Sequence, residues 1–322
     1  MAHSKSSARC NDLSGLTFKF SVENTPKPRE PIRDSKTTVY DQLSPHKAKG
    51  FLALHTNGER CLDLLFRDQI ARVAREKNSR IILAYDFPFE NPANRQTLFT
   101  RAEKLLKAVH PYICAVKFNH HLTLPLGVFD GVQKLVTAAH EKGLVTIMDC
   151  KANDIGSTNQ VIADYYYAAG FDALIANPFV GWEEGLKPIF DVARRVERGV
   201  ILLVYMSHKA AFEGYGQTII DAETSRQMLQ YISFAKKALK ADADGAVVGA
   251  TYPEKIREVH EILAEKVPIY SPGIGAQGAT VEPAVKAGSR YLIVGREITL
   301  SPNPDEAAIR VRDAARHVSG ES

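Results

Sequence analysis

The sequence has few cysteines, no long apolar run and little excess charge, and each of these absences excludes a class of protein. The four cysteines, Cys10, Cys61, Cys114 and Cys150, are widely spaced and form no Cys-x-x-Cys pair, which argues against a zinc finger and favours reduced thiols. No stretch approaches the roughly 18 apolar residues that span a bilayer, and residues 1–10 lack the apolar core of a signal peptide. We therefore expect a cytoplasmic protein that makes no membrane contact.

The small positive charge belongs to the N-terminal segment. The 322 residues carry a formal net charge of +4. Nine of the 41 Lys and Arg and five of the 37 Asp and Glu lie in residues 1–50, which leaves 32 of each sign for the rest. Because a neutral body argues against a general nucleic-acid-binding surface, we expect no nucleic-acid partner.

The order of apolar runs predicts an α/β barrel that follows an N-terminal extension. Residues 1–60 scatter Ser, Pro and charge without a sustained period, which indicates an extension that is partly ordered at best. Residues 62–76 have the apolar spacing of an amphipathic helix. Short β-branched runs then alternate with helical patterns, as in parallel β/α units. The expected strands are residues 81–85, 113–118, 144–148, 173–176, 200–205, 245–248, 268–271 and 291–294. Eight such units favour a (β/α)8 TIM barrel over residues 61–322 rather than an open doubly wound sheet.

Polar residues gather where these expected strands end. A barrel of this kind carries its functional side chains at the C-terminal ends of the strands, where the loops to the helices begin. The residues at those positions are Asp86, Lys117, Asp149, Lys151, Asn177, Ser207, the segment 273–278, Gly295 and Arg296. We therefore expect a single polar site at this end of the barrel.

A charged cluster follows the third expected strand. Asp149 and Lys151 lie two residues apart and point to the same side of an extended strand end, and Asp154 lies just beyond them. Lys117 projects from the neighbouring strand, so two ammonium groups and two carboxylates can alternate and keep one another ionised. On the residues alone, a structural ion-pair network, a Schiff-base lysine and a site for a hard divalent cation remain open. Flanking carboxylates oppose the lowered lysine pKa that a Schiff base needs, so a protonated Lys151 that acts as a general acid fits better.

A glycine-rich segment follows the seventh expected strand. Residues 272–278, Pro-Gly-Ile-Gly-Ala-Gln-Gly, match G-x-G-x-x-G, and Glu297 lies nearly far enough downstream for a ribose contact. This pattern suggests a dinucleotide site, but that fold begins with such a loop, whereas six expected strands precede it here. In a barrel, the loops after strands 7 and 8 commonly bind phosphate through backbone N–H groups, and Arg296 would add a cationic fork. We interpret the segment as a phosphate site.

From about residue 81 onward, the sequence resembles the orotidine 5'-monophosphate decarboxylase family. The D-x-K-x-x-D-I pattern is present as Asp149, Lys151, Asp154 and Ile155, and Thr158 follows it. The segments Leu-Ala-Tyr-Asp86, Val-Lys117-Phe, Met-Ser207-His, Pro272-Gly-Ile-Gly-Ala-Gln277-Gly and Ile-Val-Gly295-Arg296 occur in the family's order. The D-x-K-x-x-D core is also similar to Mg2+-dependent sugar-phosphate barrels of the 3-keto-gulonate 6-phosphate decarboxylase and hexulose phosphate synthase type. Ile155, Ser207 and Gln277 favour the first family.

The resemblance implies a homodimeric, cofactor-independent enzyme that converts orotidine 5'-monophosphate to uridine 5'-monophosphate in de novo pyrimidine synthesis, with no metal site. It assigns proton donation at C6 to Lys151, a place beside the departing carboxylate to Asp149, and support of Asp149 with a ribose contact to Lys117. It assigns a ribose hydroxyl to Asp86, the pyrimidine to Ser207, the phosphate to Gln277 and Arg296, and further substrate contacts to Pro272 and Gly295. Asp154, Ile155 and Thr158 would reach into the neighbouring subunit's site. The alternatives are a Mg2+-dependent sugar-phosphate lyase and a nucleotide-binding protein without catalysis. We expect His120, His121 and His208 to be non-catalytic.

Overall fold

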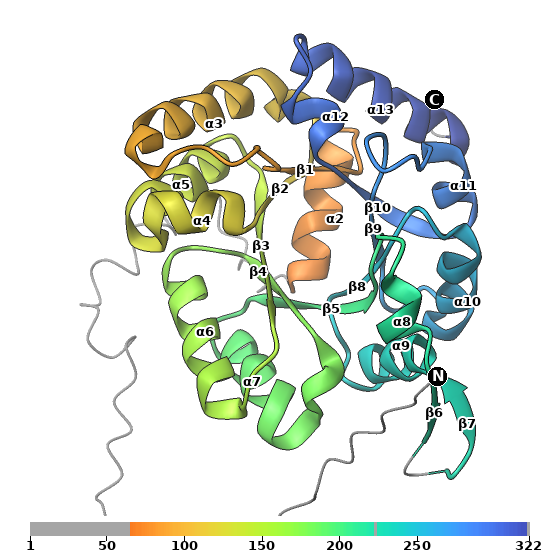
Figure 1. Ribbon diagram of the computed structural model, residues 1–322. Coiled ribbons are helices and arrows are strands. Elements are labelled where there is room, and N and C mark those ends of the chain that lie inside the picture. Colours follow the sequence, from red (N-terminus) through yellow and green to blue (C-terminus); the bar gives the residue numbers. More distant parts are fainter. Residues whose placement is uncertain (1–64, 222–223, 321–322) are drawn as a thin grey trace, which may run out of the picture. The chain divides into compact units, whose positions relative to one another are not determined.

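Eight of the apolar runs form the parallel strands of a closed barrel, and helices surround them (Figure 1). The computed structural model describes residues 65–221 and 224–320. The expected N-terminal extension and its boundary with the barrel therefore lie outside the described residues. The strands are β1 (Ile81–Ala84), β2 (Ala115–Phe118), β3 (Val145–Ala152), β4 (Ala173–Ala176), β5 (Gly199–Tyr205), β8 (Gly245–Val248), β9 (Ile269–Pro272) and β10 (Ser289–Val294). The predicted TIM barrel is confirmed.

Consecutive strands pair in chain order, and the first pairs with the last. The order around the barrel is β1-β10-β9-β8-β5-β4-β3-β2. The ring closes where Ile81, Ile82 and Leu83 of β1 lie opposite Leu292, Ile293 and Val294 of β10. Strands covered on both faces must be apolar along their whole length, which explains why these runs do not alternate with polar residues. In β1, β4 and β5, every residue is buried.

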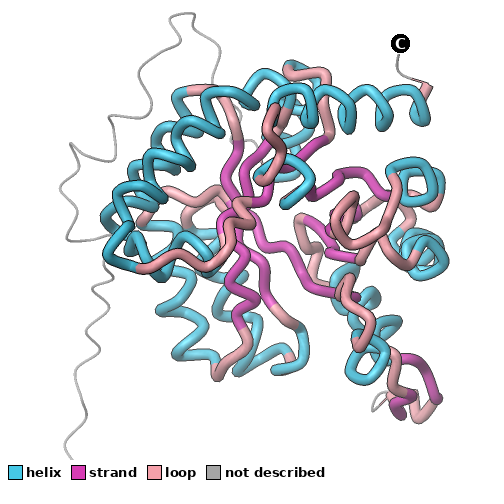
Figure 2. Tube along the Cα trace, turned by 45° about the horizontal axis from the view of Figure 1, so that its top comes forward, coloured by secondary structure: helices cyan, strands magenta, loops and turns pink. Residues whose placement is uncertain are grey.

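The helices of the β/α units form the outer layer (Figure 2). The longer ones are α3 (Arg95–Val109), α5 (Gln133–Glu141), α6 (Gly156–Ala168), α7 (Lys187–Arg195), α9 (Gln230–Lys240), α10 (Pro253–Leu263) and α13 (Pro304–Ser319). The shorter ones are α4 (His120–Leu126), α8 (Ala211–Tyr215), α11 (Val281–Lys286) and α12 (Arg296–Thr299). Single turns or π-helical segments cover Pro92–Asn94, His110–Tyr112, Gly127–Val132, Pro178–Val180 and Trp182–Leu186. None of the described helices is both long and apolar enough to cross a bilayer.

One further helix, α2 (Phe66–Glu76), precedes the first strand, as the apolar spacing predicts. It begins later than the expected residue 62, and residues 62–64 lie outside the described part. Phe66, Ile70, Val73 and Ala74 are its buried residues, and their spacing puts them on one helical face. Burial of that face anchors α2 to the barrel.

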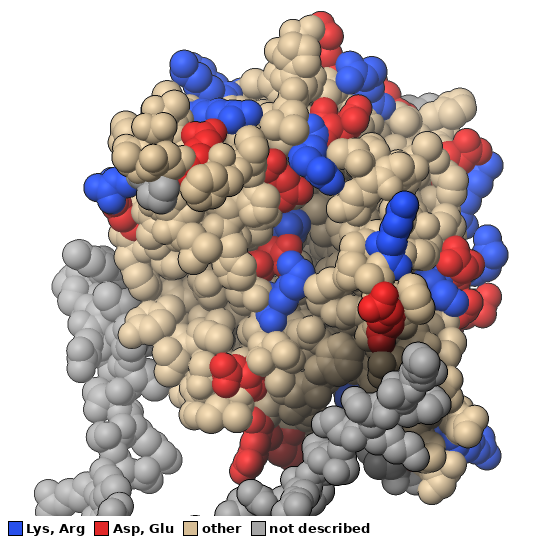
Figure 3. Space-filling model, in the orientation of Figure 1, with Lys and Arg blue, Asp and Glu red and all other residues tan. Residues whose placement is uncertain are grey.

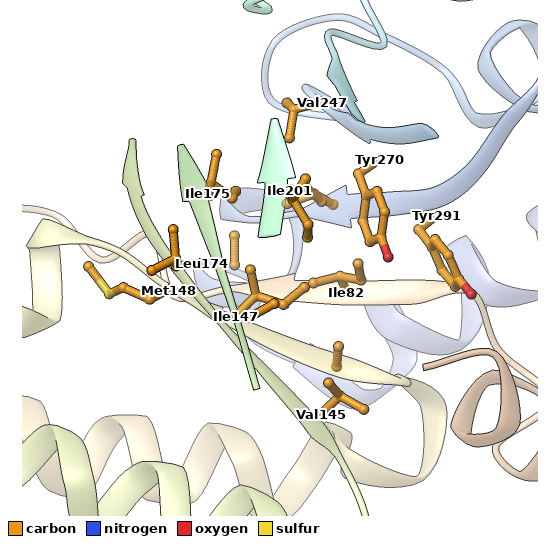
Figure 4. Packing of buried hydrophobic residues seen from close by; sticks show 14 of the residues in the cluster. Ile82, Val145, Ile147, Met148, Leu174, Ile175, Ile201, Val247, Tyr270 and Tyr291 are labelled. Carbon is orange, nitrogen blue, oxygen red and sulfur yellow. The ribbon is translucent and has the colours of Figure 1, made fainter. Parts of the chain in front are cut away.

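The barrel interior is filled with branched and aromatic side chains (Figure 4). Ile82, Ile147 and Ile201 come from different strands and are almost fully buried. Tyr270 and Tyr291, on the adjacent strands β9 and β10, stack with ring centroids 4.8 Å apart. Such a packed interior leaves the strand ends as the places where a site can form.

Two features differ from the sequence prediction. The third strand runs to Ala152, so Asp149 and Lys151 lie within β3 rather than after it. A small antiparallel hairpin, β6 (Thr218–Ile220) with β7 (Gln227–Leu229), follows α8, and it was not expected. Its strands have three residues each and lack a sustained apolar alternation, so periodicity gives no signal for them.

Candidate active site

A pocket of about 420 Å3 opens at the C-terminal ends of the strands, and we call it the rim pocket. Its apolar floor consists of Ile175, Leu203, Met206, Val247, Pro272 and Ile293. Its polar residues are Asp86, Lys117, Asn119, His120, His121, Asp149, Lys151, Ser207, His208 and Gln277. Figure 3 shows a hollow in the middle of this face in which Lys or Arg and Asp or Glu side chains lie side by side. The predicted convergence of polar groups at this end of the barrel is confirmed.

Asp149 lies between two lysines at the bottom of the charged cluster. The Nζ of Lys117 donates to Oδ2 of Asp149 at 2.5 Å, and the Nζ of Lys151 donates to Oδ1 at 2.6 Å. Lys117 lies on β2, opposite Ile147 of the neighbouring strand β3. The pairing of these two strands therefore brings the Lys117 ammonium group close to the Asp149 carboxylate. The Lys117 side chain is 6% exposed, whereas that of Lys151 is 39% exposed. Lys151 is therefore the more accessible cation of this pair.

Asp149 is held in its ionised form. Burial by itself would raise its pKa, but the charges and hydrogen bonds of Lys117 and Lys151 outweigh burial and lower the pKa to about 2. Each carboxylate oxygen already accepts a hydrogen bond from an ammonium group. At neutral pH the cluster thus presents a fixed negative charge beside a partly exposed positive one.

The backbone at Lys151 has an unusual conformation. Its φ is 49°, in the left-handed region that side chains with a Cβ rarely adopt. The pairing of β3 with β4 also shifts register between Met148 and Ala152. The sequence suggested an extended strand at Lys151, but the backbone is not extended there. Despite this irregularity, the Lys151 ammonium group contacts Asp149. Strain of this kind persists where surrounding contacts over-determine it, and functional sites are common examples.

Asp86 is positioned by a residue that the sequence prediction missed. The Nδ2 of Asn119 donates to Oδ1 of Asp86 at 2.6 Å, while the Asn119 side-chain oxygen accepts from the backbone N–H of His121 at the start of α4. A Cβ added at Gly295 would lie 2.0 Å from Oδ2 of Asp86, so only glycine leaves room for this carboxylate. Asn119 follows β2 directly and has a helix-capping side chain, which are the two signals that could have identified it.

The glycine-rich loop closes the other side of the rim pocket. Gly273, Gly275 and Gly278 have φ of 109°, 76° and 88°, values that favour glycine and allow the backbone to turn sharply after β9. Gln277 of this loop and Ser207 after β5 both line the pocket. A Cβ at Gly273 would lie 3.0 Å from the Gln277 side-chain oxygen and 3.3 Å from Cβ of Ser207, so these residues meet across a narrow gap. The closed barrel excludes the dinucleotide-fold interpretation of this loop.

Five predicted site residues lie outside the rim pocket. Asp154 and Ile155 are exposed and Thr158 is half-buried, and Oδ1 of Asp154 accepts from the N–H of Ile155 at 2.7 Å. Asp154 makes no ion pair with either lysine, so within one chain the cluster has one carboxylate rather than the expected two. Gly295 is buried behind Asp86. Arg296 is exposed at the start of α12 and is not among the residues that line the rim pocket.

Two histidines of the rim pocket take part in hydrogen bonds that involve backbone carbonyls. The ring of His121 hydrogen-bonds through Nδ1 to the carbonyl of Phe87, and the backbone carbonyl of His208 accepts from the Tyr252 hydroxyl at 2.9 Å. Within the described ranges, no group of three or more His, Cys, Asp or Glu side chains is arranged to hold a metal ion.

Comparison with known proteins agrees with this architecture. Residues 79–311 match the family described as "Orotidine 5'-phosphate decarboxylase / HUMPS family". The chain is 37% identical over 218 residues to orotidine 5'-phosphate decarboxylase of Pyrococcus horikoshii, with 68% of this chain and 94% of that protein covered. It is 32% identical over 238 residues to orotidine 5'-phosphate decarboxylase of Methanosarcina mazei, with 74% and 96% covered.

Two solved structures share the fold. The crystal structure of orotidine 5'-phosphate decarboxylase from Pyrococcus horikoshii OT3 has a TM-score of 0.59 and 34% identity, with 73% of this chain and 99% of that chain covered. The structure of orotidine 5'-monophosphate decarboxylase from Methanocaldococcus jannaschii complexed with the inhibitor BMP has a TM-score of 0.60 and 28% identity, with 74% and 98% covered. The matched range, the identities and the shared fold confirm the resemblance found in the sequence: the chain belongs to the orotidine 5'-phosphate decarboxylase / HUMPS family.

Proposed function

We propose that this protein decarboxylates orotidine 5'-monophosphate to uridine 5'-monophosphate, the last step of de novo pyrimidine synthesis, without a metal or organic cofactor. The observation that carries the proposal is the carboxylate of Asp149 held between the ammonium groups of Lys117 and Lys151 in the rim pocket. The relatives named orotidine 5'-phosphate decarboxylase support the choice of substrate.

The reaction needs a proton donor beside a fixed negative charge. When the bond between C6 and the carboxylate breaks, carbon dioxide leaves and the electron pair stays on C6. The Lys151 ammonium would stabilise this developing charge and transfer a proton to C6, after which the neutral amine takes a proton from water. Asp149 would lie beside the substrate carboxylate and orient Lys151. Lys117, which is almost fully buried, would hold Asp149 in place and contact the ribose from below.

Substrate contacts follow from the positions of the other groups in the pocket. Asp86, positioned by Asn119, would accept from a ribose hydroxyl, and Ser207 would contact the pyrimidine edge. Gln277 and the backbone of the glycine-rich loop would bind the phosphate, next to Pro272 on the pocket floor. Arg296 would join the phosphate only if the exposed side chain turns toward the pocket, and Gly295 would serve by leaving room for Asp86. The phosphate lies far from C6, so its binding energy would favour catalysis by holding the substrate against the charged cluster.

The second part of the proposal is a homodimer with shared sites. Asp154, Ile155 and Thr158 follow β3 but lie outside the rim pocket, and the Ile155 side chain is 66% exposed. An exposed isoleucine beside an unpaired carboxylate is suited to a neighbouring subunit, whose charged cluster would then gain a second carboxylate. Mixing two inactive variants, Lys151→Ala and Asp154→Asn, should restore partial activity, since some mixed dimers would contain one intact site. Absence of recovery despite demonstrated subunit exchange would exclude sharing.

The main alternative is a Mg2+-dependent sugar-phosphate lyase, because the family description also names the HUMPS group. A divalent cation at Asp149 would have to displace Lys117 or Lys151, since both carboxylate oxygens accept from an ammonium group. A nucleotide-binding protein without catalysis is the third candidate.

Three measurements on the purified protein separate these candidates. Purified full-length protein is mixed with orotidine 5'-monophosphate in excess EDTA, and the loss of substrate absorbance is followed. Turnover in EDTA supports the cofactor-independent decarboxylase. Turnover of a sugar phosphate that stops in EDTA and returns with Mg2+ supports the second candidate, and tight binding of uridine 5'-monophosphate without turnover supports the third. The expected cytoplasmic location stays a prediction.

A further inference from the structure

The segment that follows β1 is held in place by contacts from other elements. The Asp86 carboxylate accepts from Asn119, and the Asp86 backbone carbonyl accepts from the Thr299 hydroxyl of α12 at 3.3 Å. The next carbonyl, that of Phe87, accepts a hydrogen bond from Nδ1 of His121 at the start of α4. The bond from Thr299 is long for a hydroxyl donor. His121 is therefore the stronger polar restraint on the backbone beside Asp86.

His121 is itself placed by the residue that orients Asp86. Asn119 donates to Asp86 through Nδ2, and its Oδ1 accepts from the His121 N–H at 3.0 Å. Because a carbonyl oxygen can only accept, the ring hydrogen of His121 in the bond to Phe87 lies on Nδ1. Asn119 and His121 thus form one support, in which the first contacts the Asp86 carboxylate and the second contacts the next residue's carbonyl.

The Phe87 ring anchors the same segment in the protein core. It is 1% exposed, stacks on Tyr85 with ring centroids 5.6 Å apart, and has the Arg101 guanidinium 4.9 Å from its centroid. This buried ring keeps the segment attached to the barrel when the His121 bond is removed, whereas the direction of the Phe87 carbonyl depends on that bond. Loss of His121 should therefore move the Asp86 carboxylate without unfolding the barrel.

We propose that His121 is a positioning residue for the ribose: through the Phe87 carbonyl, it holds the Asp86 carboxylate where a ribose hydroxyl can donate to it. This role rests on the proposed function, which places the ribose at Asp86, and it gives His121 no part in proton transfer. His121 and Asp86 both line the rim pocket. A hydrogen bond weakens steeply as its geometry departs from the optimum, so a small displacement of the carboxylate is enough to lower the affinity.

Titration calorimetry with two nucleotides on the full-length protein tests the proposal. The probes are uridine 5'-monophosphate and 2',3'-dideoxyuridine 5'-monophosphate, which has no ribose hydroxyl to donate to Asp86. We expect His121→Leu to bind uridine 5'-monophosphate about fivefold more weakly than the wild type, as loss of one neutral hydrogen bond produces. The same variant should bind the dideoxy nucleotide as the wild type does. In steady-state kinetics, its KM for orotidine 5'-monophosphate should rise by a similar factor while kcat stays unchanged.

Two further variants make the test specific. His121→Asn should bind uridine 5'-monophosphate within about twofold of the wild type, because its amide nitrogen is also a δ atom and can donate to the Phe87 carbonyl. His317→Leu is the matched control, since His317 is an exposed histidine of α13 that does not line the rim pocket. It should bind both nucleotides as the wild type does.

Three results would overturn the proposal and leave the proposed function intact. They are unchanged affinity of His121→Leu for uridine 5'-monophosphate, equal weakening for both nucleotides, and the same loss in His121→Asn as in His121→Leu. Equal affinity of the wild type for the two nucleotides would overturn it together with the ribose contact of Asp86, and no binding of either nucleotide would overturn it together with the proposed function. Circular dichroism checks the fold of each variant. A misfolded His121→Leu would be replaced by His121→Gln, whose amide nitrogen lies one atom farther from the backbone than Nδ1, with the same losses expected.

Discussion

Replacement of Lys117 by methionine tests whether Asp149 needs both of its lysines. Lys117 is 6% exposed and contacts Asp149 at 2.5 Å, and methionine keeps an unbranched chain of similar length while it removes the charge. Loss of one partner from a buried ion pair costs about 3–5 kcal/mol, because the other charge is left uncompensated. Lys151 still contacts the second oxygen of Asp149 at 2.6 Å, so we expect a smaller loss of about 2–3 kcal/mol in the free energy of unfolding.

The loss has a defined pH window. The two lysines bring the pKa of Asp149 from 3.8 to about 2 against the effect of burial, which corresponds to roughly 2 kcal/mol of stability at about 1.4 kcal/mol per pKa unit. Because the folded-state pKa lies below the unfolded one, this stability is fully present above about pH 4 and is lost as the pH falls toward 2. In the variant the pKa of Asp149 rises. The difference between wild type and variant should therefore be largest above about pH 5 and should narrow below it.

Urea unfolding followed by circular dichroism measures the effect at pH 7.5 and pH 3.5. For a slope of about 3 kcal/mol per molar urea, the midpoint of Lys117→Met should fall by about 1 M at the higher pH. Lys134→Met is the control, since Lys134 is 67% exposed and pairs with Asp130 within one helical turn, where ion pairs contribute little. A midpoint equal to that of the wild type at pH 7.5, or an equal loss at both pH values, would refute this account of Asp149.

Three further predictions concern single side chains. Lys151→Ala should abolish turnover while the protein stays folded and still binds uridine 5'-monophosphate in calorimetry, because Lys151 is the proposed proton donor and the more exposed cation of the cluster; near-normal turnover would remove it from the mechanism. Asn119→Ala should raise the KM for orotidine 5'-monophosphate about tenfold with little change in kcat. The reason is that the Asp86 carboxylate loses the hydrogen bond from Asn119, and a hydrogen bond to a charged group contributes about 1.5–3 kcal/mol. A loss confined to kcat in steady-state kinetics would contradict this ribose-positioning role. Burial raises the pKa of Asp244 to about 6, above its value in the unfolded chain. Ionised Asp244 therefore lowers the free energy of unfolding above about pH 6, and this destabilisation disappears as the pH falls toward 4. Asp244→Asn, which keeps an acceptor for the Val200 N–H, should therefore unfold at a higher urea concentration than the wild type at pH 8 and lose most of this advantage at about pH 4; a lower midpoint at pH 8 would show that the charge stabilises the fold.

The sequence determined the barrel and the centre of its charged cluster. Strand runs such as residues 81–84 and 173–176 are apolar on both faces, and that pattern is local, so it can be read without tertiary contacts. The position of a polar residue at a strand end is local too, which is why Asp86, Lys117, Asp149, Lys151, Ser207 and Gln277 were found together before the fold was known.

Only the tertiary structure decided the rest, because it depends on distances between residues far apart in the chain. Asn119 supports Asp86 across 33 residues, and no periodicity reports such a contact. The left-handed backbone at Lys151 arises where β3 shifts register against β4, although the sequence suggests an extended strand there. Arg296 and Asp154 have the expected spacing, yet the turns that carry them leave both outside the rim pocket. Arg80 and Arg290 both line a cavity at the N-terminal ends of the strands, because the first and last strands pair there.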